Sequence, residues 1–282
     1  MLEAARVSPR SGAARLDRAQ LALLGALLAL AVMAWAVTQE RMEGMESMPG
    51  MDLGALGFYV TVWVVMMVAM MFPAVAPTVL AYDRLREGHR VRGAGALADA
   101  TALFVGGYVV VWTIAGLAAY AAHELVRGID PAFLAWDEAG RYVAGSVLVA
   151  PAVYQVTALK RACLANCRTP MVVLAERWRD GRRGALGLGI RYGAWCLGCC
   201  WALFAALFAL GVMSVGWMAL ITMFIVAERL LPWPTAARWA VALSLLALGL
   251  GVAFFPADVP GFSEPAGGGM HGGDRDSMQM MP

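Results

Sequence analysis

Seven apolar stretches constrain this chain of 282 residues more than any other feature of its sequence. A helix that crosses a bilayer needs about 20 mostly apolar residues. The stretches that meet or nearly meet this length span residues 20–37, 55–81, 96–121, 141–159, 185–213, 215–231 and 237–255. The prediction of a membrane span is weakest for two of them, because 141–159 contains Pro151 and 215–231 is the shortest. The pattern predicts an all-α fold, a polytopic transmembrane helix bundle of about seven helices.

The composition excludes the water-soluble classes of protein. Hydrophobic residues make up 61% of the chain and charged residues 15%, whereas a soluble domain has about 45–50% apolar and about 25% charged residues. A cytosolic enzyme, a nucleic-acid-binding protein and a disordered scaffold are therefore excluded. The sequence also has no P-loop, no dinucleotide fingerprint and no DKTGT-type phosphorylation motif. We expect no ATP-driven mechanism, and the sequence leans away from an enzyme.

The distribution of charge predicts the orientation of the chain in the membrane. Seventeen of the 22 Lys and Arg residues precede the first stretch, lie in every second connection after it or, as Arg229 and Arg238 do, flank such a connection. Twelve of the 20 acidic residues lie in the alternate connections and in the C-terminal tail. Because basic loops collect on the cytoplasmic side, the N-terminus is predicted inside and the C-terminus outside. The layout is then a basic cytoplasmic tail 1–19, a membrane domain 20–255 with a Met-rich outer loop 38–54 and a basic inner loop 160–183, and a Met- and Gly-rich extracytoplasmic tail 256–282.

Four methionines lie within the second apolar stretch, in the run WVVMMVAMMFPAVAP. On a helix they form two adjacent stripes, Met66 with Met70 and Met67 with Met71. Pro73 follows directly, and prolines remove backbone donors and kink helices. Two interpretations stay open. Methionine is a flexible filler of helix contacts, but its thioether is also a soft metal ligand.

Three cysteines lie within the fifth apolar stretch, in the run GLGIRYGAWCLGCCWALF. Cys196, Cys199 and Cys200 are spaced so that one helix face carries all three sulfurs. Close helix packing is the alternative explanation, because Gly189 and Gly193 continue the same stripe of small residues. Packing does not require thiols, however, so this spacing favours a metal-binding or redox role.

A second pair of cysteines, Cys163 and Cys167, lies beyond the fourth stretch in KRACLANC. The surrounding basic residues favour the thiolate form. A reduced, inert pair in the cytoplasm explains the pattern equally well. Further along, Glu228 and Arg229 are adjacent near the inner end of the sixth stretch. Interfacial snorkelling or pairing explains Glu228, with a proton or ion path as the alternative.

Methionine is also frequent in the segments expected outside the membrane. Nothing packs around residues in such polar, acidic segments, so the filler interpretation does not apply there. Thioethers select Cu(I), and Ag(I) is expected to bind on the same grounds. The sequence therefore predicts extracytoplasmic segments that capture copper through Met42, Met45, Met48, Met51, Met270, His271, Met278, Met280 and Met281.

The two intramembrane sulfur groups lie at matching depth, counted from opposite sides of the bilayer. If the second and fifth stretches are neighbours, Met66, Met70, Cys196 and Cys200 could converge on one Cu(I). Met67, Met71 and Cys199 are near alternatives, and Cys163 and Cys167 form a candidate second ligand pair.

Three motifs together resemble a known family. The runs WVVMMVAMMFPAVAP, YQVTALKRACLANCRTP and RYGAWCLGCCWALF, followed by GVMSVGWM and AERLLP, are similar to the domain of unknown function 2182, a family of predicted metal-binding integral membrane proteins of bacteria. The resemblance covers about residues 55–235. It implies a multi-pass protein of the bacterial inner membrane with a metal site, and it adds Tyr154 and Gln155 to the residues of interest.

Three functions compete. The leading hypothesis is an integral membrane protein that binds or handles Cu(I) through its Met and Cys clusters. Its expected partners are the lipid bilayer, the metal ion and other membrane or periplasmic copper proteins; no nucleic acid is expected, and the oligomeric state is left open. The second is an intramembrane thiol–quinone oxidoreductase that uses Cys196 and Cys199, although no cysteine in the outer loops completes a relay. The third is a structural membrane subunit without chemistry of its own.

Overall fold

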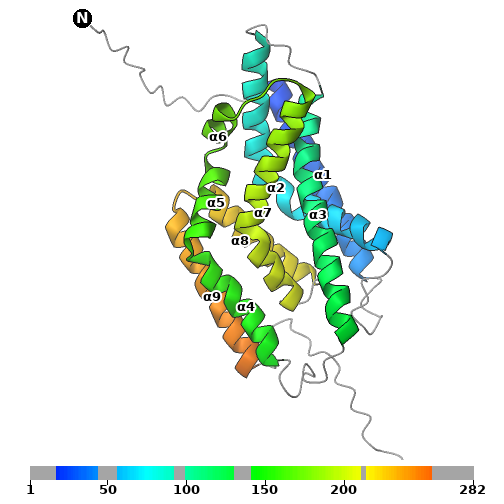
Figure 1. The fold of residues 1–282 in the computed structure, drawn as a ribbon, viewed down its shortest axis with the longest axis vertical. Coiled ribbons are helices and arrows are strands. Elements are labelled where there is room, and N and C mark those ends of the chain that lie inside the picture. Colours follow the sequence, from blue (N-terminus) through cyan, green and yellow to red (C-terminus); the bar gives the residue numbers. More distant parts are fainter. Residues whose placement is uncertain (1–16, 44–55, 92–98, 130–140, 211–213, 256–282) are drawn as a thin grey trace, which may run out of the picture.

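The computed structural model describes residues 17–43, 56–91, 99–129, 141–210 and 214–255, which are all-α (Figure 1). These ranges contain helices and no strand, as predicted. The helices are α1 (Arg18–Glu43), α2 (Leu56–Val91), α3 (Ala100–Ile129), α4 (Arg141–Gln155), α5 (Ala158–Arg168), α6 (Pro170–Glu176), α7 (Gly181–Leu210), α8 (Val215–Leu230) and α9 (Pro234–Phe254).

Five of these helices, α1, α2, α3, α7 and α9, are long and apolar enough to cross a membrane. The bent pair formed by α4 and α5 makes a sixth candidate span. Helix α8 has 16 residues, fewer than the roughly 17–25 that a span uses. The described residues therefore fit a multi-pass membrane protein with five or six spans. A seventh span and the orientation of the termini stay predictions.

Three pairs of helices make the closest contacts: α3 with α7, α4 with α9, and α1 with α2. In Figure 1, α4 and α9 run side by side, and α3 lies along α7. Helices α3 and α7 approach so closely that a Cβ atom on Gly189 would collide with the carbonyl oxygen of Phe104, and one on Gly107 with that of Leu186. For Gly189 the structure thus confirms the packing interpretation of the small-residue stripe.

The segment expected as a basic inner loop, residues 160–183, contains most of α5, all of α6 and the start of α7. Helix α4 ends at Gln155, and α5 follows at an angle of 64°. Thr157 lies in the break with an extended backbone, and its side chain accepts a hydrogen bond from the Lys160 backbone N–H at 3.2 Å, which caps the new helix. Helix α5 is amphipathic, with Leu164 and Cys167 buried. Its charged residues concealed this pattern in a search for apolar stretches.

Helices α1 and α2 also extend past the apolar stretches that predicted them. Helix α1 continues to Glu43, so residues 38–43 of the expected outer loop are helical. Thr38 is buried there, and its hydroxyl donates to the carbonyl of Ala34 at 2.8 Å. Helix α2 continues to Val91, where Arg86 pairs with Asp83 at 2.7 Å. Polar residues with local partners thus extend both helices beyond the limits set by hydropathy.

Candidate functional site

Four cysteine thiols from two helices meet in the protein interior. Cys196, Cys199 and Cys200 come from α7 and Cys167 from α5, and each side chain is 0–5% exposed. The sulfur of Cys199 lies 3.3 Å from that of Cys200 and 3.8 Å from that of Cys167. All four are free thiols. We call these four residues the cysteine cluster.

The cluster joins cysteines that the sequence assigned to two separate places. Cys167 was expected at the inner end of a straight fourth span, but the bend before α5 brings it against α7. Cys163, one helical turn earlier, is half-buried. Its sulfur lies 2.8 Å from the position that a Cβ atom on Gly198 would take. Cys163 therefore lies beside the cluster rather than within it.

The guanidinium group of Arg229 lies among three of the thiols. Its Nη2 atom is 2.8 Å from the sulfur of Cys196, 3.3 Å from that of Cys167 and 3.5 Å from that of Cys199. The residue is 6% exposed. Arg229 therefore contacts sulfur atoms, although it adjoins Glu228 in the sequence. A charged residue within an apolar segment was the only sequence signal for this role.

Glu228 pairs instead with Lys160, which comes from α5. Lys160 Nζ lies 2.7 Å from Glu228 Oε2, and the two residues are 0% and 1% exposed. The same ammonium group donates to the backbone carbonyl of Cys199, so the ion pair contacts the cluster. Lys160 was counted among the charges of an inner loop, and the structure shows it fully buried. A buried charge must be paired to be tolerated, which explains the neighbouring position of these two groups.

Two helix contacts hold α8 against the cluster. Arg168, the last residue of α5, donates to the backbone carbonyls of Glu228 at 2.5 Å and Leu231 at 2.6 Å. These carbonyls lie at the C-terminal end of α8, where helix carbonyls lack internal partners. The backbone on both sides of Arg229 is therefore fixed by α5.

Tyrosines from α3 and α7 complete the surroundings of the thiols. The hydroxyl of Tyr108 lies 3.1 Å from the sulfur of Cys196. The hydroxyl of Tyr192 donates to the carbonyl of Cys167 at 3.3 Å and lies 2.7 Å from that of Thr78 on α2. Sequence reasoning missed Tyr108, because nothing local in α3 distinguishes it from a packing residue. Of the two residues added by the resemblance, Tyr154 donates to the carbonyl of Gly198 at 2.5 Å, and Gln155 is 1% exposed.

Met66, Met67, Met70 and Met71, which we call the methionine run, are all buried in α2 with 0–4% exposure. Helix α2 contacts α7 at two levels: the Thr78 hydroxyl meets Tyr192, and the Trp63 ring lies 6.1 Å from that of Phe204. The second and fifth apolar stretches are therefore neighbours in space. The midpoint between these contacts falls near Met70 on α2 and near Cys199 on α7. The convergence of Met66 and Met70 with Cys196 and Cys200 on one ion stays a prediction.

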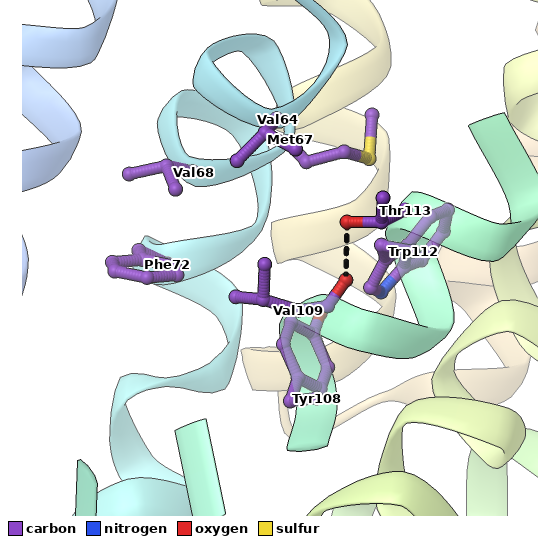
Figure 2. Close-up of a pocket in the computed structure, with 8 residues that line it drawn as sticks. All are labelled: Val64, Met67, Val68, Phe72, Tyr108, Val109, Trp112 and Thr113. Carbon is purple, nitrogen blue, oxygen red and sulfur yellow. Dashed lines mark hydrogen bonds between the residues drawn. The ribbon is translucent and has the colours of Figure 1, made fainter. Parts of the chain in front are cut away.

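Two contacts describe the surroundings of the methionine run. Pro73 cannot donate to the carbonyl of Ala69, and the indole N–H of Trp35 donates to that carbonyl instead, at 3.1 Å. Met67 lines a cavity of about 10 Å³ between α2 and α3. Figure 2 shows its side chain extending toward Trp112 and Thr113. Such a cavity holds at most one water molecule, and the role of Met67 as a copper ligand stays a prediction.

The predicted capture residues lie almost entirely beyond the described ranges. Met42 falls in the last turn of α1. Outside the description are Met45, Met48, Met51, Met270, His271, Met278, Met280 and Met281.

Chemically, the cysteine cluster offers soft donors with an adjacent positive charge. Thiolates bind Cu(I), and the donors of the cluster therefore suit that ion. Across the described ranges, no group of three or more His, Cys, Asp and Glu side chains is arranged to hold a metal ion as it stands. Around the cluster, the atom that contacts three of the sulfurs is a guanidinium nitrogen.

A comparison with protein families gives one match. A family model described as PpoB2, copper chaperone, matches residues 60–252, which include the methionine run, the cysteine cluster and Arg229. This is a related metal-binding family and not the domain of unknown function 2182 that the motifs suggested. No curated protein and no solved structure matches the chain. The match and the apolar helices together fit a membrane protein that handles copper.

Proposed function

We propose, because the chain belongs to the PpoB2 copper chaperone family, that it holds Cu(I) on the cysteine cluster as cargo for transfer to another protein. The single observation that carries this proposal is the convergence of four buried thiols from α5 and α7. Two of the sulfur contacts are 3.3 and 3.8 Å. Family membership supports copper, and the donor set supports its Cu(I) form, because soft thiolates select that ion.

The charges around the cluster support the same assignment. A buried ion must be compensated, since an unpaired charge in a low-dielectric region is costly. Thiolates can neutralise Cu(I), and Arg229 offsets additional negative charge on the sulfurs it contacts. Four thiolates also form structural zinc sites, so the copper chaperone family match, rather than the donor set, favours copper over zinc.

The methionine run serves as the approach to the thiols in this proposal. Met70 lies near the level of Cys199, and thioethers bind Cu(I) without deprotonation. The Met- and His-bearing segments beyond the described ranges collect the ion at the surface. Other membrane or periplasmic copper proteins are the expected recipients. The family match favours this copper function over the oxidoreductase and structural-subunit alternatives.

Copper analysis of the full-length protein in detergent tests the proposal. The protein is loaded with Cu(I) under anaerobic, reducing conditions, and bound copper is measured per polypeptide. Cys196→Ser and Cys199→Ser should each lose most of the bound copper. Cys163→Ser is the matched control, because Cys163 lies on the same helix as Cys167, one turn away and half-buried. It should keep the wild-type copper content.

Retained copper in the cysteine variants would contradict the proposal. If Cys196→Ser and Cys199→Ser retain the wild-type copper content while remaining folded, the cysteine cluster is not the binding site. Equal loss in the Cys163→Ser control would mean that the thiols act through general folding rather than as ligands. Unfolding temperatures of all variants distinguish these cases from simple destabilisation.

A further inference from the structure

One contact in the cysteine cluster is a sulfur–sulfur contact between two different helices. The Cys167 sulfur on α5 lies 3.8 Å from the Cys199 sulfur on α7, and both residues are free thiols. We propose that these two residues form a redox pair, which Cu(II) oxidises to a disulfide between α5 and α7. This activity rests on the proposed function, because copper must reach the cluster for the reaction to occur.

The geometry favours this pair over its neighbours. Cys199 and Cys200 are adjacent in the chain, so their Cα atoms are about 3.8 Å apart, which is less than the roughly 4.4–6.8 Å that disulfides require. The Cys196 sulfur is already held by the Tyr108 hydroxyl at 3.1 Å and by Arg229 at 2.8 Å. The Cys199 thiol donates to the Cys196 carbonyl. Between helices, Cys167 and Cys199 need to close the gap between their sulfurs by less than 2 Å to reach the bonded length of about 2.05 Å.

Arg229 contacts both thiols of the pair and so helps to keep their sulfur atoms close together. Its Nη2 atom contacts the Cys167 sulfur at 3.3 Å and the Cys199 sulfur at 3.5 Å. One donor thus contacts both reacting atoms from α8. When the disulfide forms, Arg229 retains its contact with the Cys196 sulfur. The pair is 1–5% exposed, so bulky oxidants are excluded, and the oxidant in this proposal is a metal ion of the size of the proposed cargo.

The reaction balances with Cu(II) as the oxidant. Two Cu(II) ions each accept one electron and become Cu(I). The two S–H bonds break, one S–S bond forms between Cys167 and Cys199, and two protons leave to bulk water. A thiol reductant reverses the reaction. Since the disulfide removes two of the four donors from the cluster, the oxidised protein should no longer load Cu(I) there.

The test uses the full chain in detergent, kept without oxygen, with a Cu(II) salt as the probe. A chelator that colours only with Cu(I) measures the reduced copper, and mass mapping without reductant identifies linked peptides. The expected result is a linked pair that contains Cys167 and Cys199, together with two Cu(I) per disulfide. Cys163→Ser should behave as the wild type. Cys167→Ser should give no such linked pair, with a matching fall in Cu(I) yield.

Three other outcomes separate this inference from the proposed function. A link between Cys196 and Cys199 would instead favour the C-x-x-C oxidoreductase. Wild-type protein that binds Cu(I) but forms no Cys167–Cys199 link would refute the redox pair and leave the copper-binding function standing. A link that forms in protein unable to bind Cu(I) would instead refute the proposed function alone.

Discussion

The cysteine cluster and the methionine run each bury four sulfur atoms, and charged side chains contact the cysteine cluster. Around the cysteines lie Arg229, which contacts three sulfurs, and the Lys160–Glu228 ion pair. In the methionine run, Met67 lines the cavity of Figure 2, and none of the residues that line this cavity is charged.

The charged neighbours of the cysteines indicate which of the two sulfur groups can be stabilised in a charged form. A thiol can become a thiolate, and a buried thiolate needs a positive partner. A thioether stays neutral and needs none. Each group has four sulfur atoms, so their number does not show which group binds an ion. The charged neighbours of the cysteines support our proposal that the cysteine cluster holds the ion.

The largest expected effect comes from breaking the ion pair beside the cysteines. Lys160→Met leaves the buried carboxylate of Glu228 without its partner, which should cost about 3–5 kcal/mol of stability. Arg161→Met is the matched control, since Arg161 is the next residue on α5 and is exposed, and its change should stay within about 0.5 kcal/mol. Unfolding of the detergent-solubilised proteins measures both.

A double variant sharpens this result. Lys160→Met combined with Glu228→Gln removes both charges, and it should recover a large part of the lost stability. If Lys160→Met alone unfolds no more easily than Arg161→Met, then the charged surroundings of the cysteines contribute nothing special. The contrast between the two sulfur groups would then lose its energetic basis.

An intermediate effect is expected on the rate of copper loading. Deleting residues 265–282 removes Met270, His271, Met278, Met280 and Met281, and it should slow Cu(I) loading several-fold while bound copper at saturation stays the same. If the bound copper at saturation collapses, the tail itself is the main site, and the cysteine cluster is a packing feature.

The predicted orientation has its own test. A reporter fused after Met281 should be exported, and one fused after Arg92 should stay cytoplasmic.

The sequence predicted the all-α class, the multi-pass character and the burial of both sulfur groups, because these depend on apolar length and helical spacing. It did not predict that Cys167 joins the cysteines of α7. That contact depends on the bend at Thr157, whose cap involves only a single hydroxyl. The positions of Arg229 and Lys160 were missed for a related reason. Charged residues near the end of an apolar stretch suggest an interface, and only contacts between α5, α7 and α8 place them inside.

The smallest expected effect lies within the methionine run and separates filler from ligand. Met67→Leu nearly conserves volume, so it should change stability by less than about 1.5 kcal/mol. Because Met67 lines a cavity with mainly apolar walls, the copper content and the Cu(I) loading rate of the Met67→Leu protein should also stay at wild-type values.

Met70→Leu should be equally mild for stability, since Met70 is likewise buried in α2. It lies near the level of Cys199, however, so its loss should slow Cu(I) loading or lower its occupancy, although less than Cys199→Ser does. Anaerobic loading kinetics of the two variants, compared side by side, provide the measurement. Identical kinetics for Met67→Leu and Met70→Leu would show that the methionine run only packs the helices, and the cysteines would then bind the ion without help from α2.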